Sequence, residues 1–312
     1  MPSDFAIRRM RFVPRFRLRG RASLVVGAVV FVIFLIVGVI GPFITPYDPN
    51  EVDISNILKG ASLDHLLGTD ELGRDVLSRV VSGARISLIF GLAATAVAAV
   101  IGTMLGLLAG YFGRLIDDLV MRIVDLILIF PTILLSILLV AIIGQGLMNL
   151  VIAISVAGIP SYARLIRAYV LSAKQQDYVI AVRLLGGSTP RVLGKHVLPN
   201  GISPLIINST FLVPRAISDA ATLGFLGIGV KPPQAEWGSM LAAAQAHFMT
   251  DQYLIFPPGI ALFLVVIGLN LFGDGLRDLW DPRTGAAILR LRRANVVVAE
   301  IPVKAIPDEG PA

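Results

Sequence analysis

Long stretches without a charged residue constrain this chain more than any other feature of its sequence. The runs cover residues 22–47, 86–113, 126–163, 196–214 with 220–230, and 252–273. Since a helix needs about 20 apolar residues to cross the hydrocarbon core of a bilayer, these runs predict an all-α integral membrane protein. The composition, 55% hydrophobic and 15% charged, lies outside the ordinary range of soluble domains and supports that class.

The run 126–163 is long enough for two crossings, with Gly144, Gln145, Gly146 and Asn149 forming the turn between them. The sequence therefore predicts six transmembrane helices. They lie near residues 23–44, 86–109, 124–143, 149–168, 205–229 and 253–273.

The distribution of Lys and Arg predicts the orientation of these spans, because short cytoplasmic loops are enriched in both residues. The first 21 residues carry seven arginines and one acidic residue, Asp4. The connection between spans four and five is also basic, whereas residues 46–79 hold seven acidic and three basic residues. We therefore expect both termini and the connection between spans four and five in the cytoplasm, and residues 46–79 outside.

Two other interpretations of the basic character fit less well. A cleaved signal peptide has an apolar region of about 7–15 residues, and the first run here is longer, so we expect a retained anchor helix. The pI of 9.9 also raises the question of nucleic-acid binding. Because the arginines flank the spans, topology explains them better, and no nucleic-acid partner is expected.

The residues for metal binding or catalysis are scarce. The chain has no cysteine, and its histidines, His65, His196 and His247, are far apart in sequence, so no resident metal is expected. No phosphate-binding loop is present, since Gly194-Lys195 is followed by His196. No nucleophile, base and orienting group occur together, and an enzyme is therefore not expected. If transport is driven by ATP, another chain supplies the ATPase.

Small residues recur every fourth position in the second span, at Ala98, Gly102, Gly106 and Gly110. This spacing places them on one helix face and lets a second backbone approach closely. We expect a packing ridge there.

One pair of charges falls inside the fifth span. Arg215 and Asp219 are separated by one helical turn, so each can neutralise the other. Charges at membrane depth are costly and usually face a partner helix or a hydrated pathway. A transport pathway and a structural ion pair are both open interpretations of Arg215 and Asp219.

The polar segment between spans four and five predicts two short helices. The first begins at Asp177 and is closed by Gly186 and Gly187, and Ser188 or Thr189 with Pro190 starts the second, which ends at Pro199-Asn200-Gly201. The bend would present apolar side chains among basic ones. These side chains are Val182, Leu184 and Leu185. Such a knob suits docking to a soluble partner, although a plain helical linker is the simpler interpretation for a membrane protein in general.

This segment resembles the EAA loop of bacterial ABC-importer permeases. Ala181 falls within the triplet, Gly186 follows at the family spacing, and a Leu-Pro pair ends at Pro199, whereas Ile180 and Val182 replace the Glu and the second Ala. Further motifs are similar to those of the DppC/OppC permeases of dipeptide and oligopeptide importers. They are residues 67–79 (LGTDELGRDVLSR), 83–88 (GARISL), 116–125, 130–131, 223–227 (LGFLG), 236–241 (EWGSML) and 270–283.

The resemblance implies a type I ABC importer permease fold with an amino-terminal anchor helix, in a bacterial inner membrane. The expected divisions are a basic segment at 1–21, the anchor at 22–45, an extracytoplasmic segment at 46–82, the core at 83–274 with a coupling loop at 171–203, and a cytoplasmic tail at 275–312. The implied partners are a homologous permease subunit, two ATPase subunits that bind ATP and Mg²⁺, an extracytoplasmic solute-binding protein and membrane lipid. This chain itself would hold no cofactor.

The resemblance also implies roles for particular residues. The coupling loop would receive the movement of the ATPases through Asp177, Ala181, Val182, Leu184, Leu185, Gly186, Gly187 and Pro199. Contacts with the binding protein are expected at Thr69, Asp70, Arg74, Asp75, Glu236 and Trp237.

We therefore expect a permease subunit that imports dipeptides or oligopeptides. Import of nickel or another small solute by the same architecture is an alternative. A secondary transporter or channel that acts alone is a third, because Arg215 and Asp219 would suit ion coupling.

Overall fold

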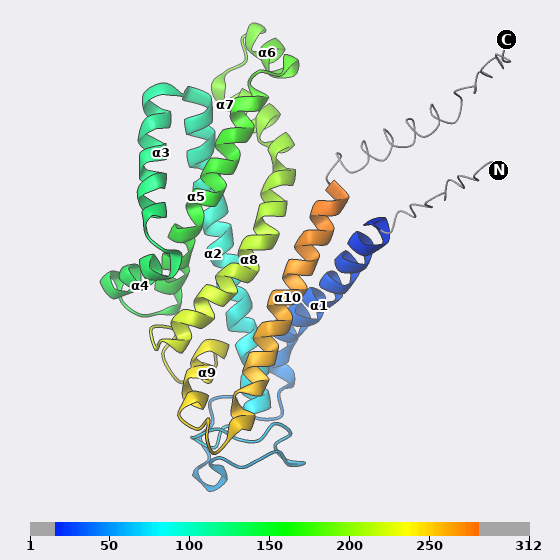
Figure 1. Ribbon diagram of the computed structural model, residues 1–312, viewed down its shortest axis with the longest axis vertical. Helices are drawn as coiled ribbons and strands as arrows, with labels where there is room; N and C mark the ends of the chain where they lie inside the picture. Colours follow the sequence, from blue (N-terminus) through cyan, green and yellow to red (C-terminus); the bar gives the residue numbers. More distant parts are fainter. Residues whose placement is uncertain (1–15, 281–312) are drawn as a thin grey trace, which may run out of the picture.

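The computed structural model describes residues 16–280, and every regular element in that range is a helix. Figure 1 shows these helices as a bundle along the long axis of the molecule. Five helical stretches are long and apolar enough to cross a membrane, and a bent pair brings the number to six if it counts as one span. The prediction of an all-α membrane protein is confirmed.

The long helices have the following bounds. They are α1 (Phe16–Ile44), α2 (Val76–Phe112), α3 (Arg114–Ile129), α4 (Thr132–Ile143), α5 (Leu147–Ala173), α8 (Ile202–Phe225) and α10 (Phe256–Trp280). The shorter helices are η1 (Ile54–Asn56), α6 (Asp177–Leu184), α7 (Thr189–Arg191), η2 (Val192–Val197), η3 (Pro199–Gly201), α9 (Trp237–Gln245) and η4 (Gln252–Leu254).

The third span differs from the prediction of one helix over residues 124–143. Helix α3 ends at Ile129 and α4 starts at Thr132, with their axes bent by 96°. Pro131 explains the break, because it has no N–H to donate and disfavours the helical conformation in Phe130. Phe130 is extended, with φ −86° and ψ 135°. The chain therefore turns sideways inside what the sequence predicts as a straight crossing.

Two helices extend beyond the spans predicted from the sequence. Helix α2 begins at Val76, ten residues before the predicted span 86–109. The cause is Asp75, whose carboxylate accepts a hydrogen bond of 2.8 Å from the Ser78 N–H and caps the helix. Helix α10 continues to Trp280, beyond the predicted span 253–273.

The small residues of α2 form the predicted ridge against α5. A Cβ added to Gly102 would lie 2.6 Å from the Tyr162 Cβ, and one added to Gly106 would lie 2.6 Å from the Ala163 carbonyl oxygen. At Gly110 the corresponding distance to the Val170 Cβ is 2.8 Å. Because nothing larger than hydrogen fits, these glycines set the close approach of α2 and α5, and the packing ridge is confirmed.

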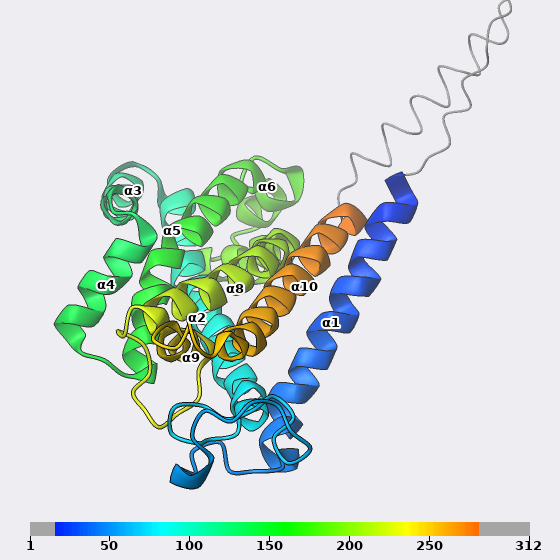
Figure 2. The ribbon, with the colours of Figure 1, turned by 60° about the horizontal axis from the view of Figure 1, so that its bottom comes forward.

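The bundle has two flanks and two ends. Helix α1 lies beside α10 on one flank, and α3 and α4 lie on the opposite flank, as Figure 2 shows. At the upper end of Figure 1 lies α6, and the start of α1 and the end of α10 point toward that end. Residues 45–75 and α9 lie at the opposite end. The start of α1, the end of α10 and α6 therefore share one end, and residues 45–75 lie at the other, as the charge distribution predicts. Which end faces the cytoplasm stays a prediction.

Candidate transport site

The loop between α5 and α8 is a bent helical knob. Helix α6 ends at Leu184, and Gly186 has a φ of +79°, the left-handed conformation that closes a helix. The Gly187 N–H donates to the Val182 carbonyl at 2.9 Å and completes this closure. The predicted bend at Gly186 and Gly187 is confirmed. We call residues 171–203 the coupling loop, after the role that the sequence predicts for them.

The second helix of the coupling loop does not end where the sequence predicts. The helical conformation of α7 and η2 continues through η3 into α8, and Gly201 keeps helical angles of φ −87° and ψ −1°. Pro199 does not end the helical conformation, because it occupies the first position of η3, where a backbone N–H is not needed. The coupling loop is therefore continuous with α8.

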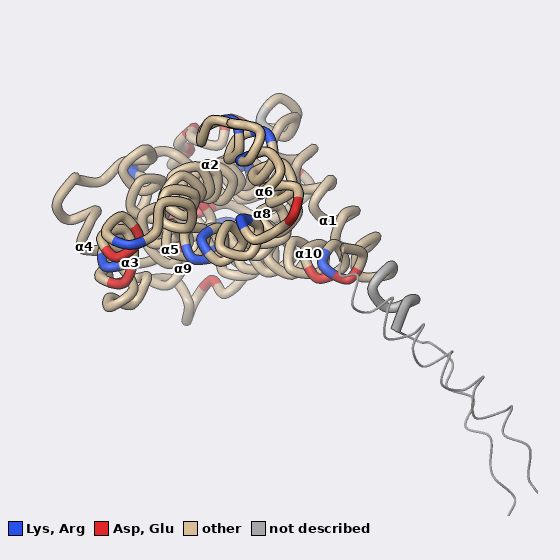
Figure 3. Tube along the Cα trace, turned by 90° about the horizontal axis from the view of Figure 1, so that it is seen from above, with Lys and Arg blue, Asp and Glu red and all other residues tan. Residues whose placement is uncertain are grey.

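Burial divides the coupling loop into an inner and an outer face. Val179, Val192 and Val197 are fully buried in one cluster with residues of α5. In contrast, Leu184 and Leu185 are 82% and 88% exposed. Seen from this end in Figure 3, Lys and Arg positions surround the tip of the loop. The arrangement is an anchored base with an apolar, exposed tip.

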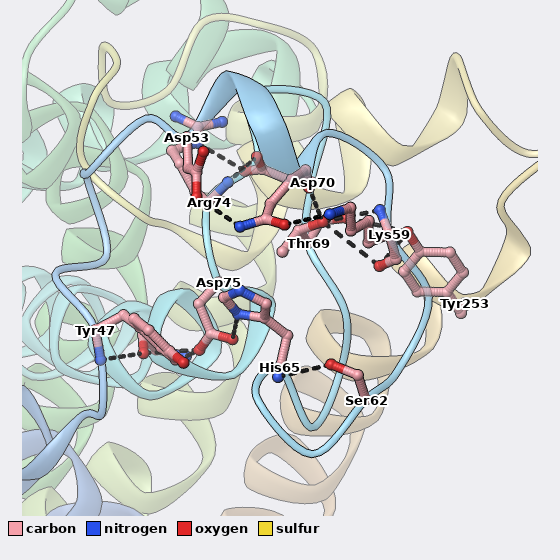
Figure 4. Close-up of polar contacts among 12 residues, drawn as sticks. Tyr47, Asp53, Lys59, Ser62, His65, Thr69, Asp70, Arg74, Asp75 and Tyr253 are labelled. Atoms are coloured by element: carbon pink, nitrogen blue, oxygen red, sulfur yellow. Dashed lines mark hydrogen bonds and ion pairs between the residues drawn. The ribbon is translucent and has the colours of Figure 1, made fainter.

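The opposite end is closed by a segment with little regular structure. We call residues 45–75 and 236–251, which include α9, the outer cap. Its centre is Asp70, whose carboxylate contacts the Arg74 Nε at 2.7 Å and the Arg79 Nε at 3.3 Å. The same carboxylate accepts hydrogen bonds from the backbone N–H groups of Leu72 and Arg74, at 2.9 and 3.0 Å. These contacts, part of which Figure 4 shows, hold the segment in a compact loop.

Further side-chain contacts tie the outer cap to the helices. His65 Nδ1 lies 3.0 Å from the Asp75 carboxylate, and the Tyr47 ring lies 4.7 Å from the His65 ring. The Tyr253 hydroxyl, at the start of the last span, donates to the Thr69 carbonyl at 3.0 Å. Figure 4 shows two groups of contacts, one with Tyr47, His65 and Asp75 and one with Thr69 and Tyr253.

Glu236 and Trp237 hold α9 in place. The Glu236 carboxylate accepts hydrogen bonds from the N–H groups of Gly238 and Ser239, at 2.7 and 2.8 Å, and so caps α9. The Trp237 indole N–H donates to the Val80 carbonyl at 2.9 Å. Burial raises the pKa of Glu236 to about 7, although the two N–H donors favour its charged form.

The residues predicted to contact a binding protein have structural roles within this chain. They are Thr69, Asp70, Arg74, Asp75, Glu236 and Trp237, and all six are buried. Their side chains take part in caps, ion pairs and packing, and their contact with a binding protein stays a prediction. Aspartate before a helix is a common cap, and this pattern at Asp75 was the sequence signal for a structural role.

A cavity of about 320 Å³ opens between α2, α4, α5 and α8. Arg215 and Asp219 both line it, with the Arg215 Nε 4.0 Å from the Asp219 carboxylate. The Arg215 Nη2 also donates to the Thr132 hydroxyl of α4 at 3.0 Å. The side chain of Arg215 is 57% exposed, and that of Asp219 is 18% exposed.

Other charges near the cavity join α3 to α5. The Arg164 Nη2, which also lines the cavity, contacts the Asp125 carboxylate at 2.7 Å. Arg167 contacts the Asp117 carboxylate through two nitrogens. These partners are far apart in sequence, and no local spacing predicted them.

A bundle of membrane-length helices around a cavity with polar and charged groups defines a membrane transport component. Residues 102–286 match the family of binding-protein-dependent transport system inner membrane components, and residues 15–61 match the N-terminal TM domain of oligopeptide transport permease C. The chain belongs to the family of binding-protein-dependent transport system inner membrane components. Family membership places it in an inner membrane and overturns the interpretation as a stand-alone secondary transporter or channel.

Similar proteins cover most of this chain. The dipeptide transport system permease protein DppC of Alkalihalophilus pseudofirmus is 40% identical over 86% of this chain and 88% of its own length. The di/tripeptide transport system permease protein DppC of Pseudomonas aeruginosa is 44% identical over 82% of this chain and 87% of its own. The glutathione transport system permease protein GsiD of Escherichia coli is 44% identical over 87% of this chain and 89% of its own length.

Proposed function

We propose that this chain is the permease subunit of an ABC importer for dipeptides and short oligopeptides. The observation that carries the proposal is that relatives at 40–44% identity over more than four-fifths of the chain are named for dipeptide, di/tripeptide and glutathione transport. All of these solutes are short peptides. Nickel or another small solute, the alternative substrate, is not favoured by these relatives.

The subunit would act within a larger complex. A homologous permease subunit would form the second half of the pathway, two ATPase subunits would bind and hydrolyse ATP, and a solute-binding protein would deliver the peptide. In this scheme the chain is not catalytic. Its own contribution is the cavity and the helices that move around it.

The coupling loop is the proposed contact with the ATPases. Its base is buried against α5 and its tip exposes Leu184 and Leu185, so it offers an apolar knob to a groove. Because the loop continues into α8, a push on the tip would move the helix that carries Arg215 and Asp219. Rigid-body movement of this kind is one route to alternating access.

The orientation is proposed on the same basis. The start of α1, the end of α10 and the coupling loop lie toward one end of the bundle (Figure 1). With the ATPases in the cytoplasm, both termini would also be cytoplasmic, and the outer cap would face the solute-binding protein. Exposed apolar residues there, such as Leu63 and Met249, would then be available for contact in place of the six buried ones.

Reconstitution tests the proposed function. The chain would be purified with its associated subunits, placed in proteoliposomes, and supplied with ATP and the loaded solute-binding protein. We expect uptake of a radiolabelled dipeptide that stops when ATP is omitted, and no uptake of ⁶³Ni²⁺. ATP-dependent nickel uptake without peptide uptake would overturn the peptide assignment, and peptide uptake without any ATPase subunit would overturn the importer.

A further inference from the structure

The cavity contains a polar group that the protein itself leaves unused. Thr95, on α2, lines the cavity and is 6% exposed, and its buried hydroxyl has no hydrogen-bond partner. Leaving a buried hydroxyl without a partner costs free energy, so such groups usually have a reason. The oxygen itself has almost no accessible surface, so the Thr95 side chain must rotate before a ligand in the cavity can supply the missing partner.

The unused hydrogen-bond donors of Arg215 are a second observation that indicates a ligand in the cavity. The guanidinium of Arg215 has five N–H donors, but its contacts are one hydrogen bond to Thr132 and a carboxylate 4.0 Å away. Arg164, on the other side of the cavity, is held by Asp125 at 2.7 Å. Arg215 is thus the loosely held cation of the cavity. Its free N–H groups match the two oxygens of a carboxylate.

The geometry of the pair limits how a peptide can bind. The charged groups of Arg215 and Asp219 are 4.0 Å apart, closer than the roughly 7 Å between the ends of an extended dipeptide. The pair must therefore open before the peptide can present its carboxylate to one charge and its ammonium group to the other. The cavity volume of about 320 Å³ falls within the range of small-ligand sites.

We infer that this cavity is a transit site for the two terminal charges of a short peptide. Arg215 binds the peptide carboxylate, Asp219 binds the peptide ammonium group, and the Thr95 hydroxyl hydrogen-bonds to the peptide between α2 and α8. This inference rests on the proposed function and deepens it. It gives the permease its own recognition of a zwitterion, separate from the selection made by the solute-binding protein.

Transport by variants of the complete importer tests the inference. In proteoliposomes with saturating loaded binding protein, R215Q and D219N should each lower the initial uptake of radiolabelled Ala-Ala by about tenfold, as expected for loss of one charge-assisted hydrogen bond. ATP hydrolysis stimulated by the binding protein should remain, so fewer peptides enter per ATP. The matched controls are R122Q and D118N, exposed charges of α3 that do not line the cavity. They should leave uptake unchanged.

Exchange of the two charges separates a ligand site from a structural ion pair. The double variant R215D/D219R keeps a pair of opposite charges one turn apart, so a purely structural pair would regain uptake. We expect the assembled complex to retain low uptake, because the exchanged charges no longer match the direction in which the peptide is presented. Uptake at the wild-type rate by the exchange variant, or by R215Q, would overturn the inference.

A measurement on the unmodified complex covers the case in which a variant fails to assemble. A dipeptide that carries a diazirine side chain would be cross-linked during turnover, and the labelled segments would be identified by mass spectrometry. Labels on α2, α5 and α8 around the cavity support the inference, and labels confined to other surfaces overturn it. If the unmodified importer takes up no peptide, the proposed function itself fails. If it takes up peptide and R215Q does so equally well, only the transit site fails.

Discussion

The outer cap and the coupling loop are the two polar ends of the molecule, and they use their side chains in opposite ways. In the outer cap, Asp70 and Arg74 are buried and paired with each other, and Asp70 also pairs with the buried Arg79 of α2. In the coupling loop, Leu184 and Leu185 point outward without a contact that buries them. The comparison teaches that a cluster of charges at a membrane boundary can be internal structure, while two exposed leucines mark the surface that is free for a partner.

Backbone hydrogen bonding explains the difference. The outer cap has almost no helix before α2, so several of its N–H groups need side-chain acceptors. Asp70, Asp75 and Glu236 supply them. The coupling loop is nearly all helical, and its backbone groups are satisfied within the helices. Its outer side chains are therefore left free.

If this comparison is right, removal of the central carboxylate of the outer cap has the largest effect on stability. Asp70→Ala would leave Arg79 buried without its counter-ion and would remove the closer of the two carboxylates that pair with Arg74, and we expect the free energy of unfolding to fall by about 3–5 kcal/mol. Chemical unfolding in detergent micelles measures it. The control is Glu71→Ala, which removes a more exposed partner of Arg74 and should cost about 0.2–1 kcal/mol. Equal losses of unfolding free energy in the two variants would contradict the buried role assigned to Asp70.

The next effect concerns pH in the outer cap. Since the pKa of Glu236 is raised from 4.5 to about 7, the folded state binds its proton more tightly than the unfolded state does. Stability from this group is full below pH 4.5 and falls as the pH rises toward 7, by about 1–3 kcal/mol. Thermal unfolding of the wild type and Glu236→Gln between pH 4.5 and 7.5 checks this. The wild type should lose stability relative to Glu236→Gln as the pH rises, and parallel curves would contradict the prediction.

In the coupling loop the expected loss is of coupling, with a smaller loss of stability. Gly186→Val forces a β-branched residue into a left-handed conformation at a cost of about 1–2 kcal/mol, although no atom lies within 4 Å of the added Cβ. We expect fewer peptides transported per ATP in proteoliposomes. Gly194→Val is the matched control, because Gly194 is also open but has no positive φ. If Gly186→Val leaves both ATP hydrolysis and uptake unchanged, the coupling assignment fails.

The smallest effect on stability is expected at the exposed tip. Replacing Leu184 and Leu185 together by Ser should change the free energy of unfolding by less than about 0.5 kcal/mol, as for other surface positions. The same change should reduce the amount of ATPase subunit that co-purifies with the chain. Leu63→Ser, at an exposed position of the outer cap, should not. Full recovery of the ATPases with the double variant would show that the tip is not their docking surface.

Much of the fold could be predicted because its signals are local. Hydropathy located the spans, the glycine pair at Gly186 located the bend, and the four-residue spacing from Ala98 located the packing face of α2, although not its partner α5. The break at Pro131 also has a local signal, since Phe130-Pro131 lies inside the predicted third span. The direction in which α4 turns depends on what packs against it, and no local pattern contains that.

The candidate site, too, was predictable only where its signal is local. The i, i+4 spacing of Arg215 and Asp219 identified the pair, because both charges lie on one helix. The rest of the cavity comes from other helices: Thr95 from α2, Thr132 from α4 and Arg164 from α5. Likewise, the six outer-cap residues were recognisable as a motif, but their burial was not.

The sequence by itself determined that the chain is a bundle of membrane helices of a known transport family with a bent loop between two spans. Hydrophobicity, glycine conformation and helical spacing act between neighbours, so the linear order of residues is enough to read them. Only the tertiary structure decided which charges are buried together and which hydroxyl is buried without a partner in a residue that lines the cavity. Those properties depend on distances between residues far apart in sequence, and packing alone sets such distances.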